Sequence, residues 1–479
     1  MNAKDGESFN VDEVCARMAL AQAGLSIWRY VFDEERLNGV WEQNRGRCYQ
    51  KVISFGTMTH LMADALLQHG GSGRRSFEKN IELGQLESSV QAAFGKLGRL
   101  PLGVSQALLR EGTIALRELF PRHGFRQLPA SLNAFEVLVL DGKSIKKVAK
   151  RLKALRGVGG GLLGGKALVA LEWSTGLALA MEAHPDGDAS EKRLVKGAVS
   201  QTDALVSKPR LFVVDRGFCD LVQATHFTAR AGDHFLVRHH RGTTFTRDRD
   251  RPEETKTDDQ GRKIVETWGW LGSTSNKGRR FVRKIHLYRP GEDEDIILIT
   301  DLLDAKAYPA TDLLLVYRGR WGIEQMFQKV TKVFGLERLI GGTPQACIFQ
   351  FSFCMLLYNI VQLVTSYIAQ AQKCDAETIS KEKLFDDMHR ELIAWNVVFT
   401  PEQTIKRFEA SLTASQLRSR LSKLLAHSWS DTWRKSPPQK NRRPSQREAK
   451  RGHGSVYRIL QAHVGLRSKA KPKPARQRC

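Results

Sequence analysis

The chain has 479 residues, more than one hydrophobic core usually supports, so two or three domains are expected. Its composition, 41% hydrophobic and 26% charged, is that of a soluble globular protein, and seven scattered cysteines without a C-x-x-C pair argue against a disulfide framework or a cysteine zinc site. The 75 Lys and Arg against 51 Asp and Glu give a net charge of +24, which favours a polyanionic partner: nucleic acid first, an anionic membrane second.

Residues 1–130 are predicted to form a helical N-terminal domain. Apolar residues recur there every three to four positions, which is the spacing of one helix face. The stretches that show this spacing are Val11–Leu25, Met58–Leu67, Ser88–Leu97 and Val104–Leu119. The basic residues between them suit a DNA-binding domain, although any helical domain would show the same pattern.

An α/β layer is predicted from about residue 131. Short apolar runs predict strands and longer runs with helical spacing predict helices, in the order strand, strand, strand, helix, strand, helix, strand. The elements are Phe135–Leu140, Ala167–Trp173, Leu177–Glu182, Ser190–Val206, Arg210–Val214, Cys219–Ala231 and His234–Arg238. The glycine-rich Gly157–Lys166 leads into a strand rather than a helix, so a flexible connection is expected there instead of a phosphate-binding loop.

A β-rich insertion is predicted at about residues 238–296. Asp215 and Glu324 are 109 residues apart (324 − 215), about 70 more than a minimal sheet fold needs between them. The surplus segment is charged and contains strand-like pieces at Ile264–Leu271 and Arg280–Tyr288. Another strand is predicted just after it.

One amphipathic helix is predicted at Tyr317–Lys332. Its apolar residues gather on one side, and a polar face carries Tyr317, Arg320, Glu324, Gln328 and Thr331. Any surface helix needs a polar face. This one, however, combines a carboxylate with an arginine and a tyrosine, which are groups that grip phosphates.

The rest of the chain is predicted to be helical, with a basic tail. Phe351–Ile368 is apolar but contains several polar residues, so a buried helix is expected there rather than a membrane span. Residues 361–433 form a C-terminal helical region. Residues 434–479 carry 15 Lys and Arg against one acidic residue, and such a segment is expected to be disordered in the absence of nucleic acid.

Three acids are the candidate catalytic residues. Asp141 follows the apolar run V-L-V-L, Asp215 follows L-F-V-V, and Glu324 lies on the later helix. Taken alone, an aspartate after a strand is common in turns, and a glutamate on the polar face of a helix is common in amphipathic helices. Together they suit Mg²⁺, which prefers carboxylate oxygens and, as a pair of ions, supports in-line phosphoryl displacement.

These motifs carry a family resemblance. L-V-L-D-G-K-S, L-F-V-V-D-R-G-F and Y-R-G-R-W-G-I-E-Q-M-F are similar to those of DDE transposases of the insertion-sequence-four family, in the RNase H-like superfamily. The family signature is Tyr, two residues, Arg, three residues, Glu, six residues, Lys. Tyr317, Arg320 and Glu324 match it, but Thr331 stands at the Lys position and Lys332 lies one place on. The resemblance spans roughly Phe135–Ile360.

The resemblance implies an RNase H-like mixed sheet with a β-rich insertion, between N-terminal and C-terminal helices. It implies that Asp141, Asp215 and Glu324 hold two Mg²⁺ ions, with Mn²⁺ as an alternative, and catalyse strand cleavage at element ends and 3′-OH transfer into target DNA. The implied partners are double-stranded DNA, at terminal inverted repeats and at the target, and a second copy of the chain. The implied location is the prokaryotic cytoplasm, at the nucleoid and not at a membrane.

Several other residues are candidate DNA contacts. The resemblance assigns Tyr317 and Arg320 to the terminal phosphates and makes Lys332 a substitute for the signature lysine. It also points to a base-stacking Trp in the insertion, for which Trp268 and Trp270 are the candidates, although a Trp in a strand is more often a core residue.

Charged neighbours of the acids have two interpretations. Arg238, at the end of a predicted strand and followed by His-His-Arg, either holds phosphates or forms a solvated edge. Arg216 and Lys143, beside the two aspartates, either approach phosphates or offset carboxylate repulsion.

Two alternative functions remain open from the sequence. One is an inactive or repurposed RNase H-like nuclease, favoured by the missing signature lysine. The other is a non-catalytic DNA-binding protein that relies on its basic tail.

Overall fold

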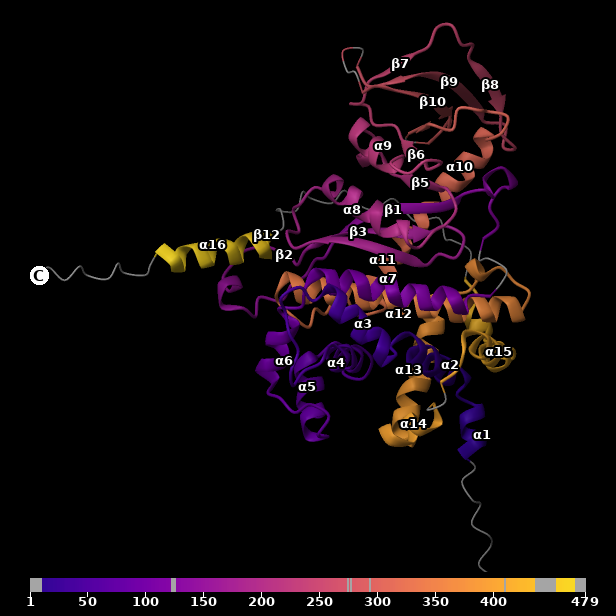
Figure 1. Cartoon of the computed structure of the whole chain (residues 1–479). Helices are drawn as coiled ribbons and strands as arrows, with labels where there is room; N and C mark the ends of the chain where they lie inside the picture. Colours follow the sequence, from indigo (N-terminus) through magenta and orange to yellow (C-terminus); the bar gives the residue numbers. More distant parts are fainter. Residues whose placement is uncertain are drawn as a thin grey trace, which may run out of the picture.

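The computed structural model describes residues 11–121, 126–273, 275, 278–292, 294–408, 411–435 and 454–469. One large sheet lies against a layer of helices drawn from both ends of the chain (Figure 1). The first helices are α1 (Val11–Ala16), α2 (Ala19–Val31), α3 (Glu34–Asn44), α4 (Phe55–Leu67), α5 (Gly73–Glu82), α6 (Val90–Leu97) and α7 (Leu102–Leu119). The later ones are α10 (Ala310–Gly319), α11 (Trp321–Lys332), α12 (Pro344–Ala371), α13 (Lys381–Val398), α14 (Pro401–Arg407) and α15 (Ala414–Leu425).

The ten-stranded sheet is mixed, which confirms the predicted fold class. Its order is β4-β3-β1-β5-β6-β11-β10-β9-β7, with β8 also paired to β9. Strands β1, β5 and β6 are parallel to one another, and the other pairs are antiparallel. The strands are β1 (Glu136–Ser144), β3 (Lys166–Glu172), β4 (Ala178–His184), β5 (Arg210–Val214), β6 (His234–Arg238), β7 (Phe245–Arg247), β8 (Glu254–Thr257), β9 (Lys263–Leu271), β10 (Arg280–Leu287) and β11 (Ile296–Thr300).

The two faces of the central strands pack into different cores. Side chains alternate along a strand, so Val137 and Val139 of β1 join the core shared with the helical layer. Leu138 and Leu140 join the other core, with α8 (Val195–Asp203) and α9 (Leu221–Phe227). The same alternation places the next odd-numbered residue, Asp141, on the face toward the helical layer.

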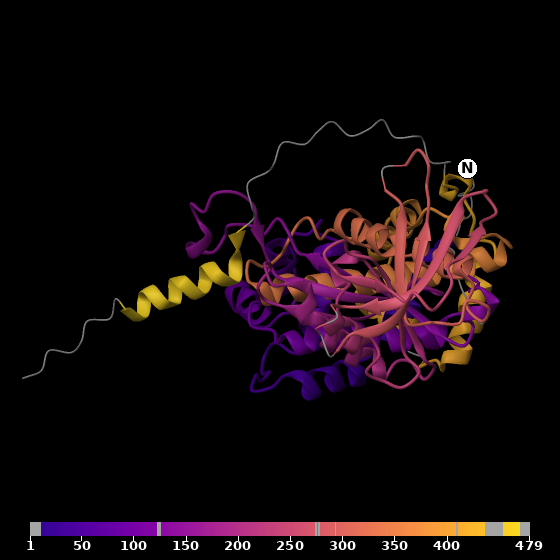
Figure 2. The same ribbon diagram turned by 90° about the horizontal axis from the view of Figure 1, so that it is seen from above.

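The strands of the predicted insertion extend the main sheet. Strand β11 pairs with β6, β10 with β11, and β9 with β10, so the charged segment adds strands to one edge. The view from above shows these strands continuing the sheet (Figure 2).

Several helix predictions differ in detail from the structure. The stretch Val11–Leu25 forms parts of two helices, α1 and α2. The helix expected at Tyr317–Lys332 is two helices, α10 and α11, which meet at Arg320. The helix expected at Cys219–Ala231 spans only Leu221–Phe227. Residues Glu191–Leu194, at the start of the helix expected before β5, form a 3₁₀ turn.

The apolar helix α12 lies in the core, as its polar residues predict. It is long and apolar enough to cross a membrane, and its apolar window is entirely buried within the described residues. Asn359 donates hydrogen bonds to Thr113 of α7 and to the Ala178 carbonyl of β4, each at 2.9 Å. The Tyr367 hydroxyl donates to the Leu119 carbonyl at 2.7 Å. These bonds join helices that precede and follow the sheet in the sequence into one layer.

Part of the predicted tail is ordered, contrary to the expectation of disorder. Strand β12 (Gly454–Ser455) pairs with β2 (Leu162–Leu163), inside the glycine-rich connection, and α16 (Val456–Lys469) follows. Asp186 accepts hydrogen bonds from the Ser455 hydroxyl at 2.7 Å and from Arg458 at 2.8 Å. A buried Val456 and these bonds hold a segment that composition alone assigns to disorder. Helix α16 projects from the body of the protein (Figure 2).

Candidate active site

Asp141 and Asp215 lie side by side because their strands are neighbours in parallel register. The last paired residues of β1 and β5 are Leu140 and Val214, and the two acids come directly after them. Asp215 ends its strand, as predicted. Asp141 does not, since β1 continues and pairs Asp141 with Val169 of β3.

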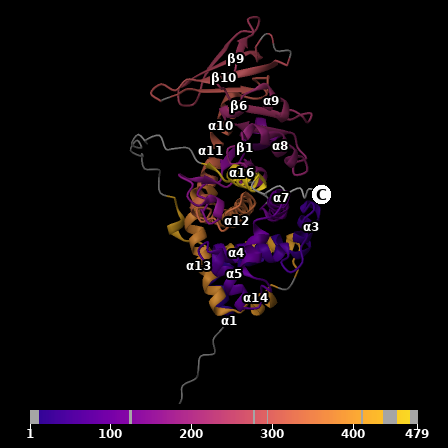
Figure 3. The ribbon, with the colours of Figure 1, turned by 90° about the vertical axis from the view of Figure 1, so that its left-hand side faces the viewer.

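Glu324 is brought to this edge by the α10–α11 junction. Helix α11 packs between β1 and α12 (Figure 3). The Trp173 indole N–H, at the end of β3, donates to the Val316 carbonyl of α10 at 3.2 Å. A Cβ atom at Gly319 would lie only 2.1 Å from the Trp173 Nε1 atom, so the missing side chain permits this close approach. The contact fixes Arg320, the next residue, against the sheet.

Arg320 lies among the three acids. Its guanidinium is 3.0 Å from a Glu324 carboxylate oxygen and 4.0 Å from one of Asp141. One turn earlier, the Tyr317 hydroxyl donates to Asp215 at 3.4 Å. Arg320 and Tyr317 therefore connect all three carboxylates.

The charges in this site act on one another. Burial would lower the pKa of Arg320, but its interactions with Tyr317 and with the carboxylates, Asp215 first, outweigh burial and raise that pKa. Burial raises the pKa of Tyr317 to about 12. The hydroxyl of Tyr317 is therefore a donor at neutral pH.

Asp141 is the acid whose ionisation is most perturbed. Burial raises its pKa to about 6, and the nearby carboxylates of Glu191 and Glu324 act in the same direction. The Gly142 N–H, which donates to Asp141 at 2.9 Å, and Arg320 act in the opposite direction. A bound cation would favour the ionised form of such a buried carboxylate.

Glu191 is a fourth carboxylate that sequence analysis missed. A Cβ atom at Gly142 would lie 2.1 Å from the Glu191 carboxyl carbon, so this side chain lies against the backbone beside Asp141. Its other neighbour is Lys166, at 3.6 Å. Only the glycine after Asp141, in D-G-K, hints at this approach in the sequence.

The donor set suits Mg²⁺ by its chemistry, because carboxylate oxygens are the ligands that this ion prefers. Within the described residues, however, no group of three His, Cys, Asp or Glu side chains is gathered tightly enough to hold a metal ion. The Arg320 guanidinium lies between the acids and offsets part of their charge. Its Nε–H is buried without a hydrogen-bond partner among the described residues.

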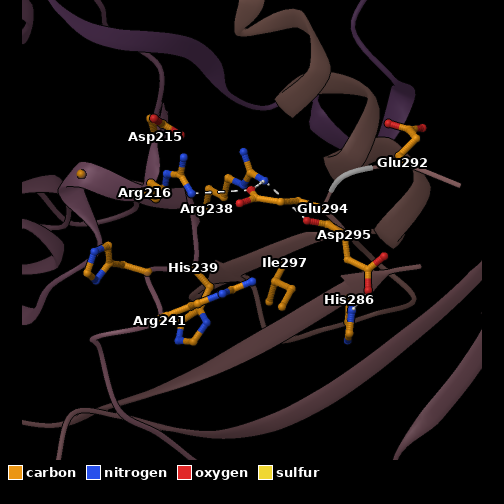
Figure 4. A pocket seen from close by; sticks show the side chains of 12 residues that line it. Asp215, Arg216, Arg238, His239, Arg241, His286, Glu292, Glu294, Asp295 and Ile297 are labelled. Carbon is orange, nitrogen blue, oxygen red and sulfur yellow. Dashed lines mark hydrogen bonds and ion pairs between the residues drawn. The ribbon is translucent and has the colours of Figure 1, made fainter. Parts of the chain in front are cut away.

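A cavity lined by both arginines and carboxylates opens beside Asp215 (Figure 4). Its volume is about 790 Å³. Arg216 and Arg238 both face Glu294, at 3.5 and 2.7 Å. Burial lowers the pKa of His239, which is bonded to the Thr243 carbonyl at 3.0 Å. The predicted basic cluster at the end of β6 thus lines a cavity rather than an isolated edge.

The two candidate tryptophans differ in exposure. Trp268 is 1% exposed, and its indole N–H donates to the Leu303 carbonyl at 2.9 Å, so its proposed role as a base-stacking residue is wrong. Trp270 is only half-buried, packed edge-to-face on Phe281 and covered by the Arg279 guanidinium at 4.4 Å. Both rings lie on the same face of β9, so the difference between them is the depth of burial along the strand, which leaves Trp270 as the more accessible candidate.

Among the described residues, no hydrogen bond or ion pair joins the signature position, Thr331, or its neighbour Lys332 to the three acids. The Thr331 hydroxyl donates to the Phe327 carbonyl at 2.6 Å, within its own helix. Lys332 is exposed on α11. Lys329 is half-buried on another side of the helix.

Comparison with known families finds a similarity in the central part of the chain. Residues 133–360, slightly less than half of the sequence, match the family model for a transposase DDE domain. No curated protein matches the sequence. The mixed sheet is consistent with an RNase H-like transposase fold. Residues 133–360 are therefore similar to a transposase DDE domain, and this similarity supports a transposase function.

Proposed function

We propose that this chain is a DNA transposase of the insertion-sequence-four kind, which uses Asp141, Asp215 and Glu324 to cut element ends and to join the 3′-OH to target DNA. The observation that carries the proposal is the arrangement around Arg320, which contacts Glu324 and Asp141 while Tyr317 contacts Asp215. Three acids that are far apart in the sequence are thereby connected through Arg320 and Tyr317, two residues whose side chains can bind phosphate.

Asp141, Asp215 and Glu324 would hold two Mg²⁺ ions, or Mn²⁺ in their place. Such ions activate the attacking oxygen and stabilise the leaving oxygen. The chain's own groups would position the DNA. Arg320 presents a planar donor set that suits a phosphate, and Tyr317 presents a neutral hydroxyl beside Asp215.

The cavity beside Asp215 would receive the backbone of the cleaved DNA. Arg216 and Arg238 line it, next to the acids. The N-terminal helices would recognise the terminal inverted repeat, and two copies of the chain would pair two ends.

Cleavage is expected to require a divalent metal. A plasmid that carries the element should be nicked at the element ends with Mg²⁺ or Mn²⁺, and not when a chelator is present. Without a metal ion the carboxylates supply no Lewis acid to activate the attacking oxygen or to stabilise the leaving oxygen. Gel analysis of the products checks this. Equal nicking in excess chelator would contradict the proposal, and no nicking under any metal would favour a repurposed or inactive protein.

Substitutions of the two β9 tryptophans are expected to have different effects, one mainly on the stability of the protein and the other mainly on DNA excision. Trp268→Ala should lower the free energy of unfolding by about 3–5 kcal/mol, because it empties a buried site. Trp270→Ala should cost much less stability but reduce excision, because a stacked base contributes about 1–3 kcal/mol. Denaturant unfolding and an excision assay check the pair. Wild-type excision by Trp270→Ala would remove that residue from the DNA interface.

A further inference from the structure

A cluster of charged groups lies on the flank of α11 that faces away from Glu324. Glu377, in the 3₁₀ turn η5 (Ala376–Thr378), is its centre. Arg126 is 3.1 Å from the Glu377 carboxylate, Lys435 is 3.5 Å away and Lys381 is 3.6 Å away. Lys329 of α11 also acts on it electrostatically. We name these five residues the Glu377 cluster.

The Glu377 cluster carries an excess of positive charge. Four basic side chains face Glu377, and Glu382 is a second acid that acts on Lys329, so with every group ionised four positive charges stand against two negative ones among these described residues, a net +2. Lys381 is only 3% exposed, whereas the side chains of Arg126 and Lys435 are 25% and 36% exposed. The excess charge is thus buried on one side and open to solvent on the other.

Ionisation within the cluster reflects this excess. Burial would raise the pKa of Glu377, but the surrounding cations lower it to about 2. Burial lowers the pKa of Lys381 to about 7 and that of Lys329 to about 8, and repulsion by the other cations contributes to both. A polyanion at the open side would relieve this repulsion.

Contacts between three chain segments hold the residues of the cluster in place. The Lys435 N–H donates to the Thr378 carbonyl at 2.8 Å, and Ile379 forms a β-bridge with Arg434. The Arg126 guanidinium lies 3.5 Å from where a Cβ atom of Gly322 would be, so it rests against the first turn of α11. Three distant segments of the chain are therefore held together at one place.

The position of the cluster relates it to the catalytic acids. At about 100° per residue, Glu324 lies on one flank of α11, and Gly322 and Lys329 lie on the other. The strip between the flanks is exposed and includes Trp321, which is 53% exposed, and Lys332. A helix is about 10 Å across, and two to three nucleotides of a strand span that distance at about 3.4 Å each.

We propose that the Glu377 cluster is a phosphate-binding site for DNA that runs from the catalytic acids across the exposed strip of α11. The inference rests on the proposed function for the location of the cleaved phosphate. Arg126 and Lys435 supply the exposed contacts, and Lys381 and Lys329 supply the positive field behind them. Glu377 holds the cations in place and limits their attraction for DNA.

The test is the salt dependence of DNA binding by the full chain, in chelator, with a labelled duplex of about 30 base pairs, or about three helical turns. Arg126→Gln combined with Lys435→Gln should reduce the slope of log affinity against log salt by about 2, one for each phosphate that is no longer neutralised. Lys306→Gln combined with Lys406→Gln removes the same charge from two exposed positions outside the cluster and should leave the slope nearly unchanged. Thermal unfolding checks that all variants are folded.

Glu377→Gln provides the opposite change. It removes the central negative charge, so DNA binding should become severalfold tighter at low salt, whereas a purely structural ion network predicts lower stability and no tighter binding. Unchanged slopes in the double variant, or no gain of affinity in Glu377→Gln, would overturn the inference. Because the assay contains no metal and scores no cleavage, these results are separate from the failure or success of the catalytic proposal.

Discussion

Replacing Asp141 or Asp215 by Asn, or Glu324 by Gln, is expected to reduce DNA cleavage by at least about a thousandfold, since residues that act as one catalytic unit each cause losses of this size or larger. The amides are isosteric with the carboxylates and still accept hydrogen bonds from Arg320 and Tyr317. The fold and DNA binding should therefore be retained. Cleavage rates at saturating Mg²⁺, with DNA binding measured in parallel, check the prediction for each variant.

Glu191→Gln is the matched control for these variants. Glu191 is also a carboxylate close to Asp141, but its charged neighbour is Lys166 rather than Arg320. Its loss should change the rate far less than the loss of any of the three acids. A variant of the three that still cleaves in Mg²⁺ would remove that residue from the site, and an inactive Glu191→Gln would add a fourth acid to it.

The sequence predicts the strands well because each one is a short apolar run with a clear end. Arg210–Val214 is β5 to the residue, and the parallel register of β1 and β5 follows from the fold class. Two of the three acids can therefore be placed side by side by sequence reasoning. The placement of the third acid, Glu324, beside them depended on the family resemblance, because helical spacing alone does not say which face of the helix meets the sheet.

Features made by contacts between distant segments could not be predicted in this way. The break at Arg320 depends on Trp173, and the approach of Glu191 depends on Gly142. The Glu377 cluster combines side chains from residues 126 to 435. The ordering of residues 454–469 depends on pairing with β2, a strand too short to show any periodicity.

Gly319→Ala is expected to lower both stability and activity, because it separates α10 from the sheet. The new Cβ atom would lie 2.1 Å from the Trp173 Nε1 atom, and Trp173 is buried and bonded to Val316, so the indole cannot easily move aside. Overpacking of this kind costs about 1–3 kcal/mol of unfolding free energy. Arg320 follows directly, and a displacement of about 1 Å at a catalytic site can reduce the rate about a hundredfold.

Two further variants make this prediction specific. Gly39→Ala introduces the same methyl group into a helix where nothing lies within 4 Å, so it should change neither stability nor cleavage adversely. Trp173→Phe has a smaller ring, so it should restore part of the activity when combined with Gly319→Ala, as a positive coupling in a double-mutant cycle. Denaturant unfolding and cleavage rates of the two single variants, the double variant and the wild type measure that coupling. Additive losses, with no restoration, would mean that the α10–α11 junction is not held by the contact between Gly319 and Trp173, and that Arg320 reaches the acids by the packing of α11 alone.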